Sequence, residues 1–157
     1  NTVFFFILGK IIALKELTQG DLKGLSVISR FTINKAIQIS KNKNHNIKIK
    51  TAIALAKGLN VDFPKLFSRL TNEDIKNMGD YIEDDYVDIF IQNVKRLIRG
   101  KKQKALSSDP GVKEATVSEI LNHKVSDPYL SSIVSISEVL NVEVEVLLRR
   151  GGLENDF

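Results

Sequence analysis

Cysteine is absent from this chain, and so are long hydrophobic runs. The lack of cysteine excludes disulfide scaffolds, thiolate zinc sites and cysteine nucleophiles, and it is compatible with the cytoplasm. The most apolar run, from Val3 to Leu8, is shorter than the ~20 residues of a membrane-spanning helix even when it is extended to Leu14. No basic leader or small-residue cleavage site accompanies that run, so we expect neither a membrane segment nor a signal peptide. The sequence begins with Asn1 rather than with Met, and it leaves open whether residues precede Asn1.

Motifs of enzymes are also lacking. There is no glycine-rich phosphate loop, nucleophile elbow or His-Glu metal motif. His45 and His123 each stand without a neighbouring ligand residue, and the carboxylates form runs typical of a surface. The sequence therefore favours a protein that is not an enzyme, with no cofactor, no metal and no small-molecule substrate.

The 157 residues are enough for one ordinary domain or two small ones, and the hydrophobic fraction of 43% suits a globular fold. The chain has 23 Lys and Arg residues against 19 Asp and Glu, a net charge of +4. This balance mildly favours an anionic partner, and the distribution of the charges is more informative than their total.

The stretch from Leu17 to Gln38 has the pattern of a helix-turn-helix. Thr18, with Asp21 three residues later, forms a capping box that begins a short helix. A turn at 24–28 follows, and Ser29 caps a second helix over 30–37. Its inward face is apolar, with Ile33, Ala36 and Ile37, whereas its outward face carries Arg30, Asn34, Lys35 and Gln38. These outward side chains can contact base edges and phosphates, and such a helix suits the major groove of DNA.

The pattern resembles the lambda-repressor-like (Cro and phage-repressor type) helix-turn-helix family. The residues that match are Thr18-Gln19, Leu22 and the pair Ile28-Ser29. The chain departs from the family at Lys23, where alanine is preferred, and at Val27, where glycine is preferred. A β-branched residue at that point implies a somewhat different turn.

The chain also repeats itself. Val3, Phe6 and Ile7 match Val87, Phe90 and Ile91 at an offset of 84 positions, as do Gln19 and Gln103, Leu22 and Leu106, and Thr32 and Thr116. After the second helix of the motif the offset becomes 81, and Leu59-Asn60-Val61 matches Leu140-Asn141-Val142. We interpret the chain as two consecutive domains of the same fold.

The predicted fold is all-α, with two tandem five-helix lambda-repressor-like helix-turn-helix domains at 1–68 and 86–148. A partly helical acidic linker at 69–85, with a capping box from Thr71 to Asp74, joins them, and a tail at 149–157 is expected to fray. In the first copy, a helix over 51–57 is expected to end at Gly58, and Asp62 is expected to cap a helix over 63–67.

The second copy has a basic first helix and a recognition helix expected over 113–122. Basic residues on the outer face of the first helix and in the turn after it could anchor phosphates: Lys95, Arg96, Arg99, Lys101, Lys102 and Lys104. Glu114 and Glu119 replace Arg30 and Lys35 of the first copy, and a carboxylate near phosphates is unfavourable. The sequence leaves open whether this copy binds DNA or serves dimerisation.

The resemblance implies a sequence-specific double-stranded DNA-binding transcriptional regulator, a repressor of phage, plasmid or mobile-element type. It implies a cytoplasmic, nucleoid-associated protein of a bacterial or phage-infected cell. In the family pattern, Ser29 to Asn34 and Gln38 face bases, while Gln19 and the lysines hold phosphates. The complete set of predicted DNA contacts is Gln19, Ser29, Arg30, Phe31, Thr32, Asn34, Lys35, Gln38, Lys41, Lys43, Lys101, Lys102, Lys104, Lys113, Thr116 and Ser118.

Two alternatives stay open at this point. The apolar excess from Phe4 to Leu8 is either a homodimer interface or is covered by the linker through Ile75, Met78 and Ile82. The competing function is a protein-interaction module, antitoxin-like or binding a polymerase or another regulator, with the acidic linker as its contact. Single-stranded nucleic acid is disfavoured because the basic stretches lack interleaved aromatic residues.

Overall fold

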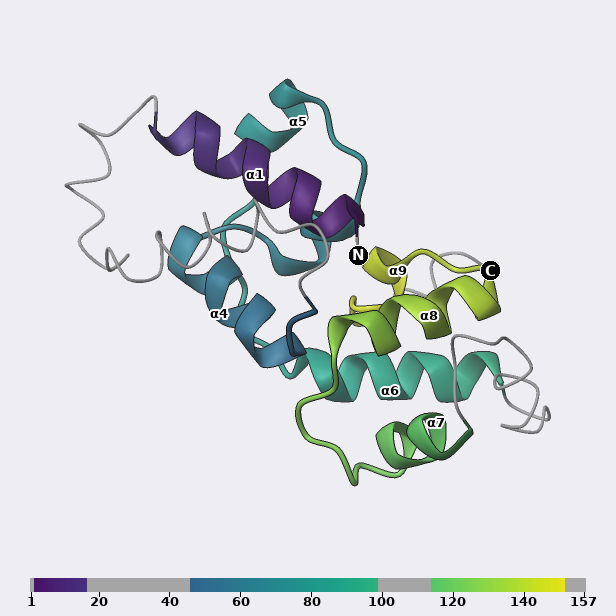
Figure 1. Ribbon diagram of the computed structural model, residues 1–157. Coiled ribbons are helices and arrows are strands. Elements are labelled where there is room, and N and C mark those ends of the chain that lie inside the picture. The colour runs from purple at the N-terminus through teal and green to yellow at the C-terminus, as the bar shows by residue number, and fades with distance from the viewer. Residues whose placement is uncertain (1, 17–45, 99–113, 152–157) are drawn as a thin grey trace. The chain divides into compact units, whose positions relative to one another are not determined.

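The computed structural model describes residues 2–16, 46–98 and 114–151, which form helices linked by turns (Figure 1). The helices are α1 (Thr2–Glu16), α4 (Ile49–Leu59), the 3-10 helix η1 (Phe63–Phe67), α5 (Asn72–Lys76), α6 (Tyr86–Leu97), α7 (Glu114–Leu121), α8 (Leu130–Leu140) and α9 (Val144–Leu147). These ranges contain no β-strand, only an isolated antiparallel bridge between Lys48 and Tyr129. The prediction of an all-α chain is confirmed for the described part.

Two compact units make up the chain. The first comprises residues 1–45 and 51–82, and the second comprises residues 46–50 and 83–157. The segment predicted as a linker, 69–85, contains α5, which packs on α1 in the first unit. The capping box predicted there is present, because the Thr71 hydroxyl accepts from Asp74 N–H at 3.1 Å and the Asp74 carboxylate accepts from Thr71 N–H at 3.0 Å.

The core of the first unit lies between α1 and η1. Phe4 of α1 is fully buried, and its ring centroid lies 5.3 Å from that of Phe67 in η1. Phe63 meets Phe67 edge to face at 5.5 Å, an arrangement that aromatic rings prefer. The Pro64 ring is buried in the first turn of η1, where its missing N–H costs nothing.

Most of the apolar excess at the start of α1 is covered within the unit. Phe4, Phe5 and Leu8 are each at most 3% exposed, whereas Phe6 is 59% exposed. Of the linker side chains expected to cover them, Ile75 is buried and Ile82 is 59% exposed. Phe6 is therefore the one residue of 4–8 that stays exposed.

Helices α4 and α8 end in the same way, at positions that the offset of 81 relates. Asn60 and Asn141 adopt left-handed conformations with φ of 52° and 54°. The next N–H in each case turns back to a carbonyl five residues earlier, from Val61 to Ala56 at 3.0 Å and from Val142 to Ser137 at 3.1 Å. The prediction that the first of these helices ends at Gly58 is wrong, because α4 continues to Leu59, whose side chain is buried.

Segments 46–50 and 127–131, which the offset of 81 also relates, pair with each other in the second unit. Their backbone hydrogen bonds run from Ile49 N–H to Pro128 O and from Leu130 N–H to Ile47 O, each at 2.8 Å. Side-chain oxygens add a reciprocal pair of caps: Asp127 accepts from Lys50 N–H at 2.9 Å, and Asn46 accepts from Ser131 N–H at 3.3 Å. Each segment thus caps the first turn of the helix that the other begins.

The core of the second unit is built on α6, which packs against α7 and α9, while α8 also packs against α9 (Figure 1). One polar side chain, Asn93, is buried on the inward face of α6 at 2% exposure. Its amide donates to the carbonyls of Leu147 at 2.9 Å and Arg149 at 3.0 Å. The first carbonyl belongs to the last residue of α9, where a helix has no partner of its own to offer, and the second follows the C-cap Leu148.

Replacing Asn93 by alanine should destabilise the protein by about 2 kcal/mol, because buried acceptors are then left without their donor. Urea unfolding followed by circular dichroism measures this change, with Gln92→Ala on the exposed side of α6 as the matched control. Equal stability of the two variants would contradict the role assigned to Asn93.

Candidate nucleic-acid interface

Most of the predicted DNA contacts lie outside the described residues. This holds for the whole helix-turn-helix motif at 17–38 and for Lys41, Lys43, Lys101, Lys102, Lys104 and Lys113. Thr116 and Ser118 are described, and both lie on α7. Among the described residues, the candidate interface is therefore α7 with its surroundings.

Helix α7 has one buried and one accessible side. Val117, Ile120 and Leu121 are each at most 1% exposed and hold the helix in the core. Thr116 and Ser118 are half-buried, and Glu119 is exposed. The sequence predicts a recognition helix over 113–122, and α7 lies within that range at Glu114–Leu121.

Polar groups at the end of α7 are held in place by local hydrogen bonds. His123 adopts a left-handed conformation with φ of 58°, and Lys124 N–H donates to Glu119 O at 2.9 Å, which closes the helix end. The Asn122 amide donates to the Ser118 hydroxyl oxygen at 3.1 Å, one turn earlier. This leaves the Ser118 hydroxyl as a donor and the Asn122 carbonyl oxygen as an acceptor for a ligand.

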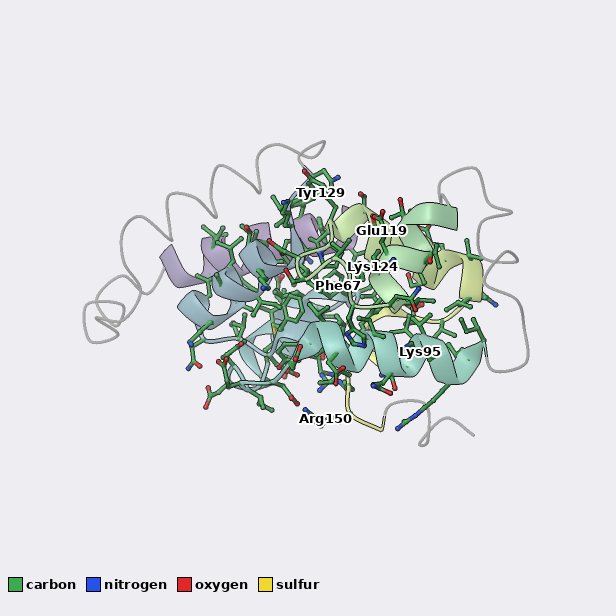
Figure 2. All side chains as sticks on the ribbon, turned by 90° about the horizontal axis from the view of Figure 1, so that it is seen from below. Phe67, Lys95, Glu119, Lys124, Tyr129 and Arg150 are labelled. Atoms are coloured by element: carbon green, nitrogen blue, oxygen red, sulfur yellow. The ribbon has the colours of Figure 1, made fainter. Side chains whose placement is uncertain are left out.

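The charges near α7 are of both signs. Lys124 and Glu119 are exposed, and they can be followed in Figure 2. On α6, which packs against α7, Lys95 and Arg96 are exposed in the last turn. The cations favour phosphate contact, whereas Glu119 disfavours it unless the carboxylate accepts a hydrogen bond from a base such as cytosine.

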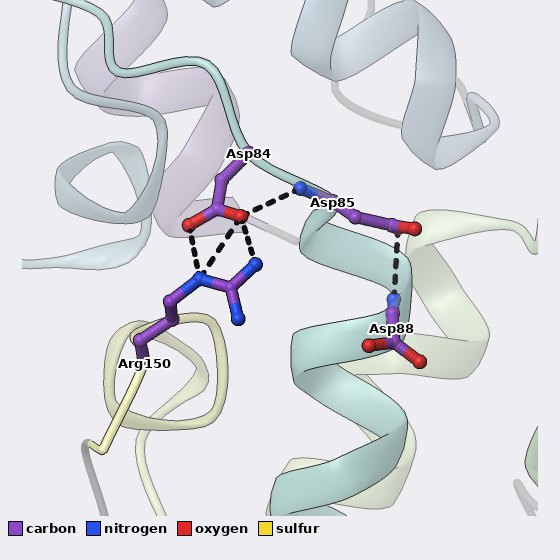
Figure 3. A network of polar contacts seen from close by, with 4 residues as sticks. All are labelled: Asp84, Asp85, Asp88 and Arg150. Atoms are coloured by element: carbon purple, nitrogen blue, oxygen red, sulfur yellow. Dashed lines mark hydrogen bonds and ion pairs between the residues drawn. The ribbon is translucent and has the colours of Figure 1, made fainter.

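The start of α6 is acidic and is tied to the chain after α9. Figure 3 shows Asp85 accepting from Asp88 N–H at 3.1 Å as the cap of α6, and Asp84 accepting from Asp85 N–H at 2.9 Å. Arg150 binds the Asp84 carboxylate in a bidentate manner: its Nε lies 2.8 Å from Oδ2, and its Nη2 donates to Oδ1. The neighbouring Arg149 pairs with Glu145 at 3.2 Å. Arg149 and Arg150, the first two residues of the segment predicted as a tail, thus each take part in an ion pair.

Sequence reasoning missed Asn93 and the Arg150–Asp84 pair. Asn93 carried a signal, since it is a polar residue beside the apolar stripe of its helix. Arg150 carried no local signal in the sequence, because its partner Asp84 lies 66 positions away.

The described part of the chain offers no metal centre and no membrane span. Its His, Asp and Glu side chains form no group of three or more that could hold a metal ion. None of its helices combines the length and the apolarity needed to cross a membrane. His123, described at the end of α7, is exposed, and His45 lies outside the described residues.

Comparison with family models, with curated proteins and with solved structures found no match to this chain.

The Arg150–Asp84 pair makes stability depend on pH in the acidic range. The guanidinium holds the pKa of Asp84 below its ordinary value, so the pair stabilises the folded chain above the pKa of the unfolded carboxyl. This contribution disappears as the pH falls through the lowered pKa. The difference in thermal midpoint between the natural chain and Arg150→Ala should be constant near neutral pH and shrink below about pH 4.

The control is Lys124→Ala, which removes an exposed cation elsewhere in the second unit. Its difference in thermal midpoint from the natural chain should not shrink at acidic pH. A difference between the natural chain and Arg150→Ala that stays constant from neutral pH through the acidic range would contradict the assignment.

Proposed function

We propose that this chain binds double-stranded DNA sequence-specifically, as a transcriptional regulator built from two lambda-repressor-like domains in tandem. The observation that carries the proposal is the position of helix α7 in the sequence, together with the side chains that it leaves accessible. This helix lies where the sequence predicts a recognition helix, with Val117, Ile120 and Leu121 inward and a Ser118–Asn122 pair accessible. The helix-turn-helix pattern from Leu17 to Gln38 and its match at the offset of 84 support the same function.

The mechanism that follows is steric repression. A regulator seated on its operator excludes polymerase, and two recognition helices in one chain would cover two major-groove faces about 34 Å apart. Alternatively, first copies pair across a homodimer and second copies extend the footprint. Such a protein would work in the cytoplasm at the nucleoid.

The first recognition helix should carry most of the base recognition. Arg30→Ala or Asn34→Ala should each weaken binding to the preferred duplex by about 1–3 kcal/mol and relax specificity at one base position. Fluorescence anisotropy with specific and scrambled duplexes measures both effects, and Lys76→Ala, on the exposed side of α5, is the control. Unchanged affinity in both variants would remove this helix from the interface.

The second copy should bind phosphates through its basic turn. Joint replacement of Lys101, Lys102 and Lys104 by alanine should weaken binding to every duplex. It should reduce the slope of log affinity against log salt by about 0.9 for each phosphate that these lysines neutralise. The control is Lys57→Ala with Lys76→Ala, and an unaltered slope in the triple variant would exclude the second copy from DNA binding.

The competing function is a protein-interaction module, and acidic exposed side chains favour it. Glu73 and Asp80 are exposed in the first unit, and Glu119 is exposed on α7. Elution from heparin at low salt, together with weak retention on non-specific DNA, would support this function over DNA binding.

A further inference from the structure

An apolar groove lies on the first unit beside the exposed Phe6. It is lined by Val3 and Phe6 of α1 and by Arg69 and Leu70, which follow η1, and its volume is about 300 Å³. The packing of α1 against η1 brings these two segments together. Exposed aromatic residues beside an open groove are typical of sites that receive an apolar side chain of a partner.

The charged groups at this groove are cationic. Arg69 is exposed and lines it, and the Lys10 ammonium lies 4.6 Å from the centroid of the Phe6 ring. The carboxylates that follow most closely in the sequence, Glu73 and Asp74 in the first turn of α5, are not among the residues that line the groove. The groove thus joins an apolar floor to a cationic rim.

We propose that this groove binds an acidic amphipathic helix of a partner protein. One aromatic or leucine side chain of that helix enters between Phe6 and Leu70, and its carboxylates pair with Arg69 and Lys10. Recognition of this kind, an amphipathic helix with an apolar anchor in a groove, is one of the recurring modes of peptide binding. The charges at the rim supply specificity and speed association. The inference is independent of DNA binding.

Two other occupants fit the groove less well. A second copy docking groove to groove would bring Arg69 and Lys10 against their own equivalents, and like charges in contact are unfavourable. A membrane surface would need a large apolar face, whereas α1 turns Phe4, Phe5 and Leu8 into the core and leaves Phe6 outward. An acidic peptide satisfies both the apolar floor and the cationic rim.

The test uses the full chain and a fluorescein-labelled helical peptide of about four turns, with Leu and Phe on one face and Glu and Asp elsewhere. Anisotropy should show saturable binding that Phe6→Ala weakens about tenfold and that Arg69→Glu with Lys10→Glu abolishes. Ile82→Ala is the matched control, because Ile82 is exposed to the same extent, 59%, elsewhere on the chain. Thermal unfolding of each variant checks that the fold is kept.

Two peptide controls separate the contributions of charge and anchor. A peptide with Lys in place of Glu and Asp, and one with Ala in place of Leu and Phe, should both fail to bind. The proposal is overturned if the acidic peptide does not bind, or binds equally well to Phe6→Ala. It is also overturned if Phe6→Ala instead abolishes sedimentation with vesicles of anionic phospholipid, or converts a dimer of the chain into a monomer.

Discussion

Reciprocal capping between segments 46–50 and 127–131 is the constraint on which the organisation of the chain depends. The N–H groups at the start of a helix have no partner within it, and here Asn46 and Asp127 satisfy those of Ser131 and Lys50. The consequence is that a stretch from the first half of the sequence belongs to the second unit. The two segments are related by the internal repeat, so one pattern of donors and acceptors serves both sides of the contact.

Apolar periodicity made much of the helical fold predictable. The capping box at Thr71 followed from two residue types three positions apart, and the buried Val117, Ile120 and Leu121 of α7 lie at helical spacing in the sequence. The misplaced end of α4 shows where local signals fail. Gly58 is an ordinary helix stop, yet the helix continues through it to the buried Leu59 and ends before Asn60. The repeat indicates the same helix end, because the second copy has Val139 at the position of Gly58 and keeps the Leu-Asn-Val that follows.

Contacts between distant positions could not be predicted. Asn93 binds carbonyls 54 and 56 positions away, and Arg150 reaches Asp84 across 66 positions. The bridge at Lys48 and Tyr129 likewise depends on tertiary packing rather than on local propensity. Of the predicted DNA contacts, the structure describes Thr116 and Ser118, and it places both on the accessible side of a helix held by apolar residues. The functional proposal joins this arrangement to the motif in the first half.

Sequence-specific recognition of duplex DNA is the central claim, and selection from a pool of random duplexes tests it most directly. If the claim holds, the intact chain enriches a defined site and binds it at least about 10³-fold more tightly than scrambled duplex at physiological salt. A pool that stays unenriched after repeated rounds, with equal affinity for every duplex, would contradict it.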